Sequence, residues 1–454
     1  MESSKKDLEK VKDLLSSFFP SDQLLFKPEE TAIYGADASR FFKIPFAVVF
    51  PKDYRDVQKV FEVANRFKIP VIPRGRGTNV VGDCVPVKES IVVSTLYMNK
   101  ILEINDKDFV AVVEPGVLTG FLQKEAEKKG LFYPPDPSSA SYSTIGGNVA
   151  TNAGGLRAVK YGVTKDYVLG LEVVLPTGEF LKTGGRMHKN SVGFDLVRLF
   201  VGSEGTLGFM TKIILKLLPL PEYSASAVVG FKKIETGIEC IYEIFKSGIL
   251  PVALEFLDEK MSKIFAEAED LECSFIIKLD GNEDSVKRDL EKVKDVVKKA
   301  DYLKVGYRGD GEEEIWETRR LLNQISFNFG PDKLSLDISI PRKELKRAMS
   351  FIKELEKGFG LPILVFGHVG DGNLHVNIMY DKKDEAKREK AMTLSKRIYR
   401  FVTKLGGSIS GEHGVGIVRR EFLKYQLSSK EMELMKKIKT LFDPHNIMNP
   451  EKAI

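Results

Sequence analysis

The chain of 454 residues is long enough for two or three domains, because a single core stops growing near roughly 250–300 residues. Its 43% hydrophobic and 29% charged residues are typical of a globular protein and exclude a wholly disordered or fibrous chain. The net charge of +5 comes from 69 basic and 64 acidic side chains that are interleaved along the sequence, a pattern that disfavours nucleic-acid binding.

Residues 1–44 are predicted to form a helical segment. Residues 1–19 mix charged and apolar residues at helical spacing, so we expect an amphipathic helix that ends before Pro20. This stretch lacks the unbroken apolar run of a secretory signal, and no later run reaches the roughly 18 apolar residues of a transmembrane helix. The expected location is the cytoplasm, with any membrane association made through a partner.

Residues 45–220 are predicted to form the first large domain. Short apolar strands alternate with helical stretches, as in AVVF, YRDVQKVFEVANRF and PVIPRG. This order predicts a small α/β unit. The later segments SIVVST, AVVEPG and LGLEVVLPTGE predict β-hairpins and helices around a second sheet.

Residues 221–415 are predicted to form a second domain of the α+β class. The segments SAVVGF, CSFIIKLDG and LSLDISIPR alternate with charged helical stretches such as SVKRDLEKVKDVVKKA, which indicates an antiparallel sheet covered by helices. Residues 416–454 contain an amphipathic helix that stops at an Asp-Pro pair, and we expect this segment to pack back towards the first domain.

Three glycine-rich loops mark the first domain: PRGRGTN at 73–79, STIGGNVATNAGG at 143–155 and GSEGTLG at 202–208. Each is expected to follow a strand. Closely spaced glycines let successive backbone N–H groups point into one pocket, which suits a pyrophosphate, whereas a single such loop would be interpreted as an ordinary turn. The chain has no Gly-Lys dipeptide for a P-loop, and Val80 stands where a Rossmann fingerprint needs its third glycine. A dinucleotide bound by another route is therefore favoured.

Two glycine-flanked motifs in the second domain carry histidines, GHVGDGNLHVN at 367–377 and GEHGVG at 411–416. The Gly-Asp-Gly turn between His368 and His375 would let both imidazoles point at one site, with Glu412 as a third metal ligand. His413 would point another way and serve as a general base. The alternative is that these histidines only cap turns. His188 and His445 are expected to be structural or exposed.

The glycine-loop motifs, taken in order with VVEPGV and YPPDPSS, resemble the FAD-binding domain of the vanillyl-alcohol oxidase and p-cresol methylhydroxylase superfamily. The resemblance implies an α+β fold: a two-subdomain FAD-binding domain and an α+β substrate (cap) domain with an antiparallel sheet. Arg74 and Arg76 occupy the loop in which this family often carries a histidine linked to FAD, so the FAD is expected to be non-covalent. The implied FAD contacts are Pro73, Arg74, Gly75, Arg76, Gly77, Thr78, Asn79, Pro135, Asp136, Ser143, Thr144, Gly146, Gly147, Asn148, Thr151, Asn152, Gly154, Gly155, Glu204, Gly205 and Asn449.

The histidine motifs resemble those of the D-lactate dehydrogenase, D-2-hydroxyglutarate dehydrogenase and glycolate oxidase D-subunit family over essentially the whole chain. The resemblance implies that His368, His375 and Glu412 bind a divalent metal (Zn, Mn or Fe), and that His413 is the catalytic base. The implied substrate contacts are Arg319 of the W-x-x-R segment, Asn323 and Asn377. A solvated helix face is the alternative interpretation of Arg319.

The expected reaction is oxidation of a small D-2-hydroxy acid to the 2-oxo acid, with metal-assisted hydride transfer to flavin N5. D-lactate or glycolate is favoured because Asn323, Lys333 and Ser335 supply no clear clamp for a second carboxylate. Cys84, Cys240 and Cys273 form no iron–sulfur motif, so electrons are expected to leave through an external acceptor such as electron-transfer flavoprotein, an iron–sulfur partner subunit or a quinone. The alternatives are a D-2-hydroxyglutarate dehydrogenase, a relative that acts on a bulkier substrate, and a catalytically silent electron-transfer subunit.

Overall fold

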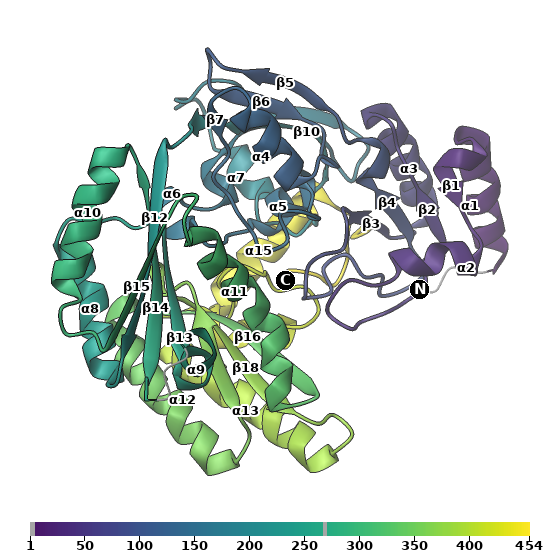
Figure 1. Cartoon of the computed structure of the whole chain (residues 1–454). Helices are drawn as coiled ribbons and strands as arrows, with labels where there is room; N and C mark the ends of the chain where they lie inside the picture. Colours follow the sequence, from purple (N-terminus) through teal and green to yellow (C-terminus); the bar gives the residue numbers. More distant parts are fainter. Residues whose placement is uncertain (1–4, 267–269) are drawn as a thin grey trace. The chain divides into compact units, whose positions relative to one another are not determined.

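The computed structural model describes residues 5–266 and 270–454, which divide into two compact units (Figure 1). The first unit contains residues 5–153, Val163–Leu220 and His413–Ile454, and the second contains Gly154–Gly162 and the described part of Pro221–Glu412. Residues 1–4 of the predicted first helix and residues 267–269 of the expected second domain lie outside the described residues.

A four-stranded sheet in the order β1-β2-β4-β3 opens the first unit. Strands β2 (Ala47–Val49) and β3 (Val71–Arg74) both run parallel to β4 (Ile91–Ser94), and β1 (Leu24–Leu25) is antiparallel to β2. Strands that run parallel in one sheet need a crossover connection. Helix α3 (Tyr54–Phe67) forms the crossover between β2 and β3, which lie on either side of β4. The predicted α/β unit is confirmed.

Helix α3 begins at its Asp53 cap, whose carboxylate accepts hydrogen bonds from the backbone N–H groups of Arg55 and Asp56. It ends where Lys68 takes a left-handed conformation. Its buried face packs with α1 (Lys5–Phe18) in one apolar core, and α1 ends before Pro20 as predicted.

The second sheet of the first unit is antiparallel, in the order β5-β6-β10-β8-β9. Its strands are β5 (Ile101–Asn105), β6 (Val110–Val113), β8 (Val168–Val174), β9 (Phe180–Gly184) and β10 (Phe209–Lys216). A short pair joins β7 (Leu131–Phe132) to β11 (Leu218–Pro219). The remaining α-helices are α2 (Pro28–Thr31), α4 (Thr119–Glu127), α5 (Ile145–Thr151), α7 (Leu196–Phe200), α14 (Leu423–Gln426) and α15 (Ser429–Phe442).

In chain order the first loop follows β3 and the second follows β7, so the expectation that every glycine-rich loop follows a strand is wrong for the third alone. Only the first loop follows a strand directly, namely β3. Most of the second is helix α5, because the Thr144 hydroxyl caps it by accepting from Gly147 N–H and the small residues permit close packing. The third loop follows helix α7. The glycines did not reveal helix α5 within the second loop or helix α7 before the third.

The second unit is built on one seven-stranded sheet in which every neighbouring pair is antiparallel, as predicted. The order is β15-β12-β14-β13-β17-β18-β16. The strands are β12 (Tyr223–Phe231), β13 (Ala253–Asp258), β14 (Cys273–Gly281), β15 (Tyr302–Tyr307), β16 (Asp332–Ser339), β17 (Ile363–Gly367) and β18 (Asn373–Tyr380).

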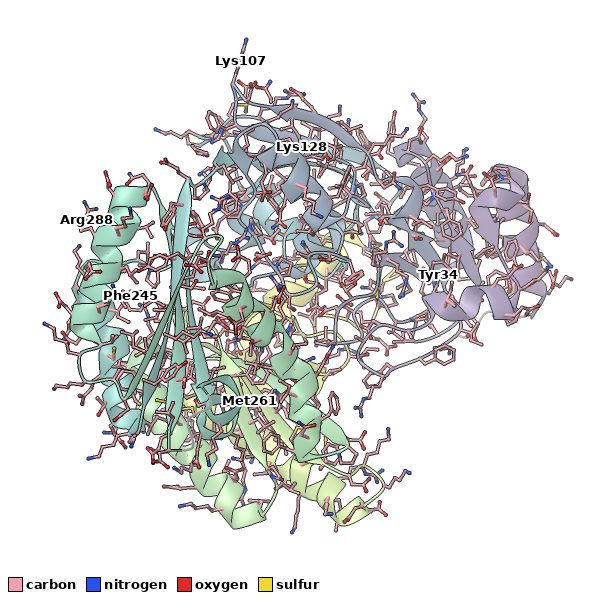
Figure 2. The ribbon with its side chains drawn as sticks, viewed as in Figure 1. Tyr34, Lys107, Lys128, Phe245, Met261 and Arg288 are labelled. Atoms are coloured by element: carbon pink, nitrogen blue, oxygen red, sulfur yellow. The ribbon has the colours of Figure 1, made fainter. Side chains whose placement is uncertain are left out.

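Helices cover both faces of this sheet (Figure 1). One face packs against α8 (Ile234–Lys246), α10 (Glu283–Val296), α12 (Leu345–Phe359) and α13 (Glu385–Lys404). The other carries α9 (Glu259–Ala266) and α11 (Glu312–Ile325), with the short α6 (Ala158–Tyr161) against β13. Met261 of α9, labelled in Figure 2, and Trp316 of α11 are buried in the core on that face.

Within the described ranges, none of the helices combines the length and the apolarity that crossing a membrane requires.

Candidate active site

The antiparallel register gathers polar side chains on the sheet face of the second unit that carries α9 and α11. His375 of β18 lies opposite Asp337 of β16 on one side and Phe366 of β17 on the other. Phe366 belongs to the core against α11, and residues opposite one another in a sheet share a face. Asn377, two residues further along β18, therefore lies on the same face as His375.

A tight turn brings His368 back to this point. His368 follows β17 directly, and β18 begins again at Asn373. Gly372 has φ +88°, and a Cβ atom there would lie 2.1 Å from the carbonyl oxygen of Ile340, so the turn requires glycine. The rings of His368 and His375 lie 5.3 Å apart at 86° to one another. The predicted convergence of the two imidazoles is thus present in the second unit.

Glu412 completes a set of three converging ligand atoms. His368 Nε2 lies 3.4 Å and His375 Nε2 lies 3.5 Å from Glu412 Oε1. One ligand atom from each residue lies within 4.8 Å of the others. Two imidazoles and a carboxylate form a donor set that suits Zn, Mn or Fe in proteins.

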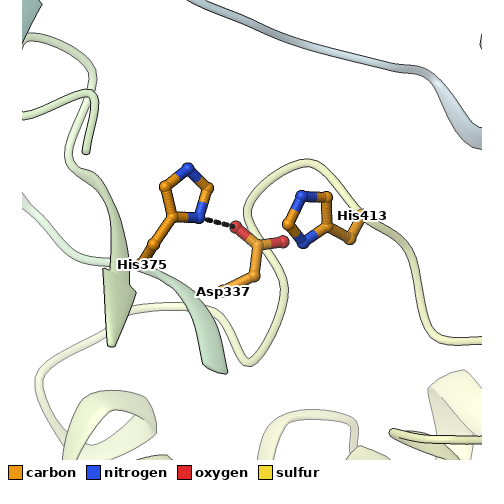
Figure 3. Close-up of side chains that lie close together, drawn as sticks. All are labelled: Asp337, His375 and His413. Atoms are coloured by element: carbon orange, nitrogen blue, oxygen red, sulfur yellow. Dashed lines mark ion pairs between the residues drawn. The ribbon is translucent and has the colours of Figure 1, made fainter. Parts of the chain in front are cut away.

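Two buried carboxylates orient these histidines from behind. Glu255 Oε1 lies 2.5 Å from His368 Nδ1, and Asp337 Oδ1 pairs with His375 Nδ1 at 3.7 Å (Figure 3). Asp337 also accepts from the backbone N–H groups of Gly411 and Glu412. A carboxylate on one ring nitrogen directs the other nitrogen's lone pair outward, as in metal-binding histidines.

The charges at this point favour a cation. Burial alone would raise the pKa of Glu255, but His368 and Arg319 outweigh it and lower that pKa to about 2. Burial alone would lower the pKa of His368, but the negative charges of Glu255 and Glu412 raise it well above its usual value. The two carboxylates thus create a negative potential that positive charge neutralises.

The three expected substrate residues differ in their surroundings. The Arg319 side chain is only 11% exposed and pairs with Glu255, so the alternative of a solvated helix face is wrong for this residue. Asn323 is exposed and accepts a hydrogen bond from Lys333. Asn377 is 1% exposed, and neither atom of its amide has a hydrogen-bond partner among the described residues.

In the first unit, the three glycine-rich loops meet. A Cβ atom on Gly75 of the first loop would lie 2.4 Å from Thr144 Oγ1 of the second. Gly205 of the third loop has φ +66°, and a Cβ atom there would lie 2.5 Å from Pro73 Cγ. Glycine therefore permits both close approaches, and backbone from all three loops borders one region.

Individual residues of the loops have different partners. Arg74 is buried and its Nη1 donates to Cys84 Sγ, whereas Arg76 is exposed. Ser143 and Asn148 both hydrogen-bond to Thr119, which stabilises the base of the second loop. The neighbouring residues Gly75, Gly77, Thr78, Pro135, Asp136, Gly146, Gly147, Thr151 and Asn152 are buried or half-buried in this unit. Gly154 and Gly155 instead belong to the second unit.

The segment that begins at His413 belongs to the first unit and is held by two of its loops. Asn79 Nδ2 donates to the His413 carbonyl oxygen at 3.0 Å. Glu204 accepts from the backbone N–H groups of Val415 and Gly416 at 2.6 and 2.8 Å. His188 and His445 are exposed, with partners Asp108, Asn65 and Lys68 in this unit.

Sequence reasoning missed Glu255 and Asp337, both 0% exposed. The available signal was an acidic residue between apolar neighbours inside a strand, Glu255 in ALEFLD and Asp337 in LSLDIS. Acidic residues are rarely fully buried unless they are paired, so this pattern indicates a partner nearby. The strand register that supplies the partner cannot be read from one strand alone.

Comparison with known proteins agrees over both parts of the chain. The family described as FAD binding domain matches residues 45–184, and the family FAD linked oxidases, C-terminal domain, matches residues 220–453. The glycolate oxidase subunit GlcD of Bacillus subtilis is 37% identical, over 92% of this chain and 91% of the relative. A D-lactate dehydrogenase of Anaerostipes hadrus is 35% identical, over 94% and 92%. A D-2-hydroxyglutarate dehydrogenase of Stutzerimonas stutzeri is 34% identical, over 97% and 98%.

Solved structures share the fold at lower identity. A p-cresol methylhydroxylase with substrate bound has a TM-score of 0.82 and 18% identity, covering 99% of this chain and 97% of that one. An alkyldihydroxyacetonephosphate synthase has a TM-score of 0.75 and 21% identity, covering 98% and 85%. The expected α+β fold is confirmed. The chain belongs to the family of FAD-linked D-2-hydroxyacid dehydrogenases and glycolate oxidases, and it is an FAD-linked oxidoreductase that acts on CH–OH groups.

Proposed function

We propose that this enzyme oxidises a small D-2-hydroxy acid, D-lactate or glycolate in preference to a diacid, to the 2-oxo acid, with a divalent metal in the second unit. The observation that carries the proposal is the convergence of His368 Nε2, His375 Nε2 and Glu412 Oε1 beside a negative potential. The buried Asn377 amide on the same sheet face supports a polar substrate there.

The first unit fits a non-covalent FAD. Gly75 and Gly205 let the three loops approach one another closely. Closely spaced glycines in such loops suit the backbone contacts that a pyrophosphate needs. Arg74 and Arg76 stand in the loop in which related FAD-binding domains often carry the linking histidine. When bound, FAD supplies the acceptor for the hydride that leaves the substrate Cα.

The ligand spacing in the second unit fits a metal. With metal–ligand bonds of about 2.1 Å, the donor atoms of a tetrahedral site lie about 3.4 Å apart. The two nitrogen–oxygen distances of 3.4 and 3.5 Å agree with that spacing. A divalent ion held by His368, His375 and Glu412 would supply Lewis-acid chemistry at the substrate oxygens.

Side chains of the chain itself would transfer the proton and bind the substrate. His413 accepts the hydroxyl proton, a role for which an imidazole is suited near neutral pH. Arg319 is held by Glu255 through Nε and Nη2, which leaves its Nη1 edge for the substrate carboxylate. Asn377 provides an amide donor and acceptor for the substrate. Electrons pass from the flavin to an external acceptor, either electron-transfer flavoprotein or an iron–sulfur partner subunit.

The first test is anaerobic bleaching of the flavin spectrum by D-lactate, L-lactate, glycolate or D-2-hydroxyglutarate, before and after removal of metal with a chelator. We expect rapid bleaching by a D-acid or glycolate, loss of bleaching after chelation and its return with a divalent ion. Absence of bleaching by all four acids, in protein that holds FAD and metal, would contradict the proposal. Preference for D-2-hydroxyglutarate would reassign the substrate to a diacid.

Replacement of the proposed base tests the role of His413. His413→Asn should retain FAD, because a change of this side chain leaves the glycine loops intact, and the rate of flavin reduction should fall at least about 100-fold. Stopped-flow absorbance measures that rate. His445→Asn changes an exposed histidine and serves as the control. Reduction of His413→Asn at the control rate would remove His413 from this role.

Glu255→Gln tests whether the buried carboxylate supports metal binding. Loss of its charge should weaken metal affinity by about 10–100-fold, as replacement of supporting carboxylates does elsewhere. Competition with a graded chelator series, read by elemental analysis, measures the affinity. Asp258→Asn is the matched control, because Asp258 is a buried carboxylate of the same strand that accepts from the backbone of Met261 and Val365 and does not belong to the candidate metal group. Equal metal loss in both variants would indicate a general effect of destabilisation.

Glu204 gives the first unit a pH dependence. Burial raises the pKa of Glu204 from 4.5 to about 7, although the N–H groups of Val415 and Gly416 oppose this. A raised pKa stabilises the folded chain below pH 4.5, and this contribution is lost as the pH rises through about 7. Between pH 5 and 8, wild-type stability should fall by up to about 3 kcal/mol more than that of Glu204→Gln, measured by urea unfolding without flavin. Parallel pH profiles would be inconsistent with the raised pKa.

A further inference from the structure

The C-terminal segment that follows α15 runs along the glycine loops of the first unit. The backbone N–H of Asn449 donates to the Val71 carbonyl at the start of β3. Its side-chain Nδ2 donates to the carbonyl oxygens of Asp83 at 2.8 Å and Glu204 at 2.7 Å. The Asn449 amide therefore joins the segment after the first glycine loop to the third loop. Because Nδ2 makes both bonds, the direction of Oδ1 is fixed.

Three buried polar atoms in this region have no hydrogen-bond partner among the described residues: Asn449 Oδ1, Asp83 Oδ1 and Lys452 Nζ. Asn449 and Lys452 are each 1% exposed, and Asp83 is 9% exposed. A buried charge without a hydrogen bond costs several kcal/mol, so native proteins pair such groups or use them for a ligand. Here two acceptor oxygens and one ammonium group of the same region lack partners within the described chain. A ligand that carries both hydrogen-bond donors and an anionic group would satisfy all three atoms.

The family resemblance already implies that Asn449 contacts FAD. We propose that Lys452 and Asp83 bind the FAD beside it, with the Lys452 ammonium donating to an anionic oxygen of the cofactor and Asp83 Oδ1 accepting from one of its hydroxyl groups. This inference rests on the proposed FAD site in the first unit. FAD carries both kinds of group, since its diphosphate and its reduced ring bear negative charge and its ribityl and ribose parts bear hydroxyls.

The charged groups of the region argue against a second metal here. Asp37, Asp83 and Cys84 each offer a ligand atom within 4.8 Å of the others. However, Arg74 donates to Cys84 Sγ at 3.3 Å, and this guanidinium already supplies positive charge beside the thiol. Burial lowers the pKa of Lys452 only to about 8, opposed chiefly by Asp83, so the ammonium is largely charged at pH 7.

Lys439 provides a matched comparison, because it is a lysine of the same unit whose Nζ is fully engaged within the protein. It donates to the carbonyl oxygens of Thr206 and Met448, at 2.8 and 2.6 Å, and to Asp443. A lysine that serves only the fold should behave like Lys439, whereas a lysine that serves the cofactor should not.

The test titrates FAD into the flavin-free full-length chain and measures the thermal midpoint without flavin. Lys452→Met should weaken FAD binding about 10–100-fold, as expected for loss of a hydrogen bond from a charged group, and should leave the thermal midpoint unchanged or raised. Lys439→Met should lower the midpoint and change FAD affinity less. Should Lys452→Met not fold, Lys452→Gln is used in its place.

Two further measurements identify the anionic group. If Lys452 contacts the diphosphate, ADP affinity falls in parallel with FAD affinity. If it contacts the flavin ring, ADP affinity is unchanged and the flavin midpoint potential becomes more negative. The inference would be overturned if Lys452→Met kept the wild-type FAD affinity and the wild-type flavin potential while its thermal midpoint fell as in Lys439→Met. A wild-type chain that binds no FAD would instead refute the proposed function.

Discussion

Two carboxylates sealed inside the sheet of the second unit determine the chemistry available on its surface. Glu255 and Asp337 are fully buried, and each is satisfied only because a histidine and other donors surround it. A buried carboxylate without such partners would be very costly, so the cost of removing either histidine falls on the fold as well as on the site. The same constraint fixes Arg319, whose guanidinium shares Glu255 with His368. The same buried contacts therefore orient the histidines and stabilise the fold of this unit.

Much of the architecture follows from local patterns. The alternation of apolar strands and helices from residue 45 predicted the small α/β unit, and the predicted helical stretch YRDVQKVFEVANRF coincides with α3. The long antiparallel sheet of the second unit followed from strands that alternate with charged helices. Helix α5 was not foreseen, because glycine and β-branched residues have low helix propensity and here the Thr144 cap and close packing override it.

The convergence of the three candidate metal ligands could be predicted from the sequence, whereas the buried carboxylates that support them could not. His368, His375 and Glu412 could be singled out because they lie in glycine-rich motifs, which indicate tight turns that bring side chains together. Glu255 comes from a strand more than a hundred residues away, and its bond to His368 depends on a sheet order that no local pattern reveals. The same holds for Lys452, whose burial depends on loops distant in sequence.

The bond from Asn449 to Asp83 spans 366 residues, and the whole second unit, residues 154–162 included, is encoded between its partners. At ribosomal rates of about 5–20 residues per second, roughly 20–70 s separate the synthesis of these two residues. During that interval the sheet of the second unit can form, whereas β3 and the glycine loops still lack their hydrogen bonds to Asn449. The first unit of the nascent chain therefore cannot complete these contacts until residue 449 has been synthesised, after every residue of the second unit.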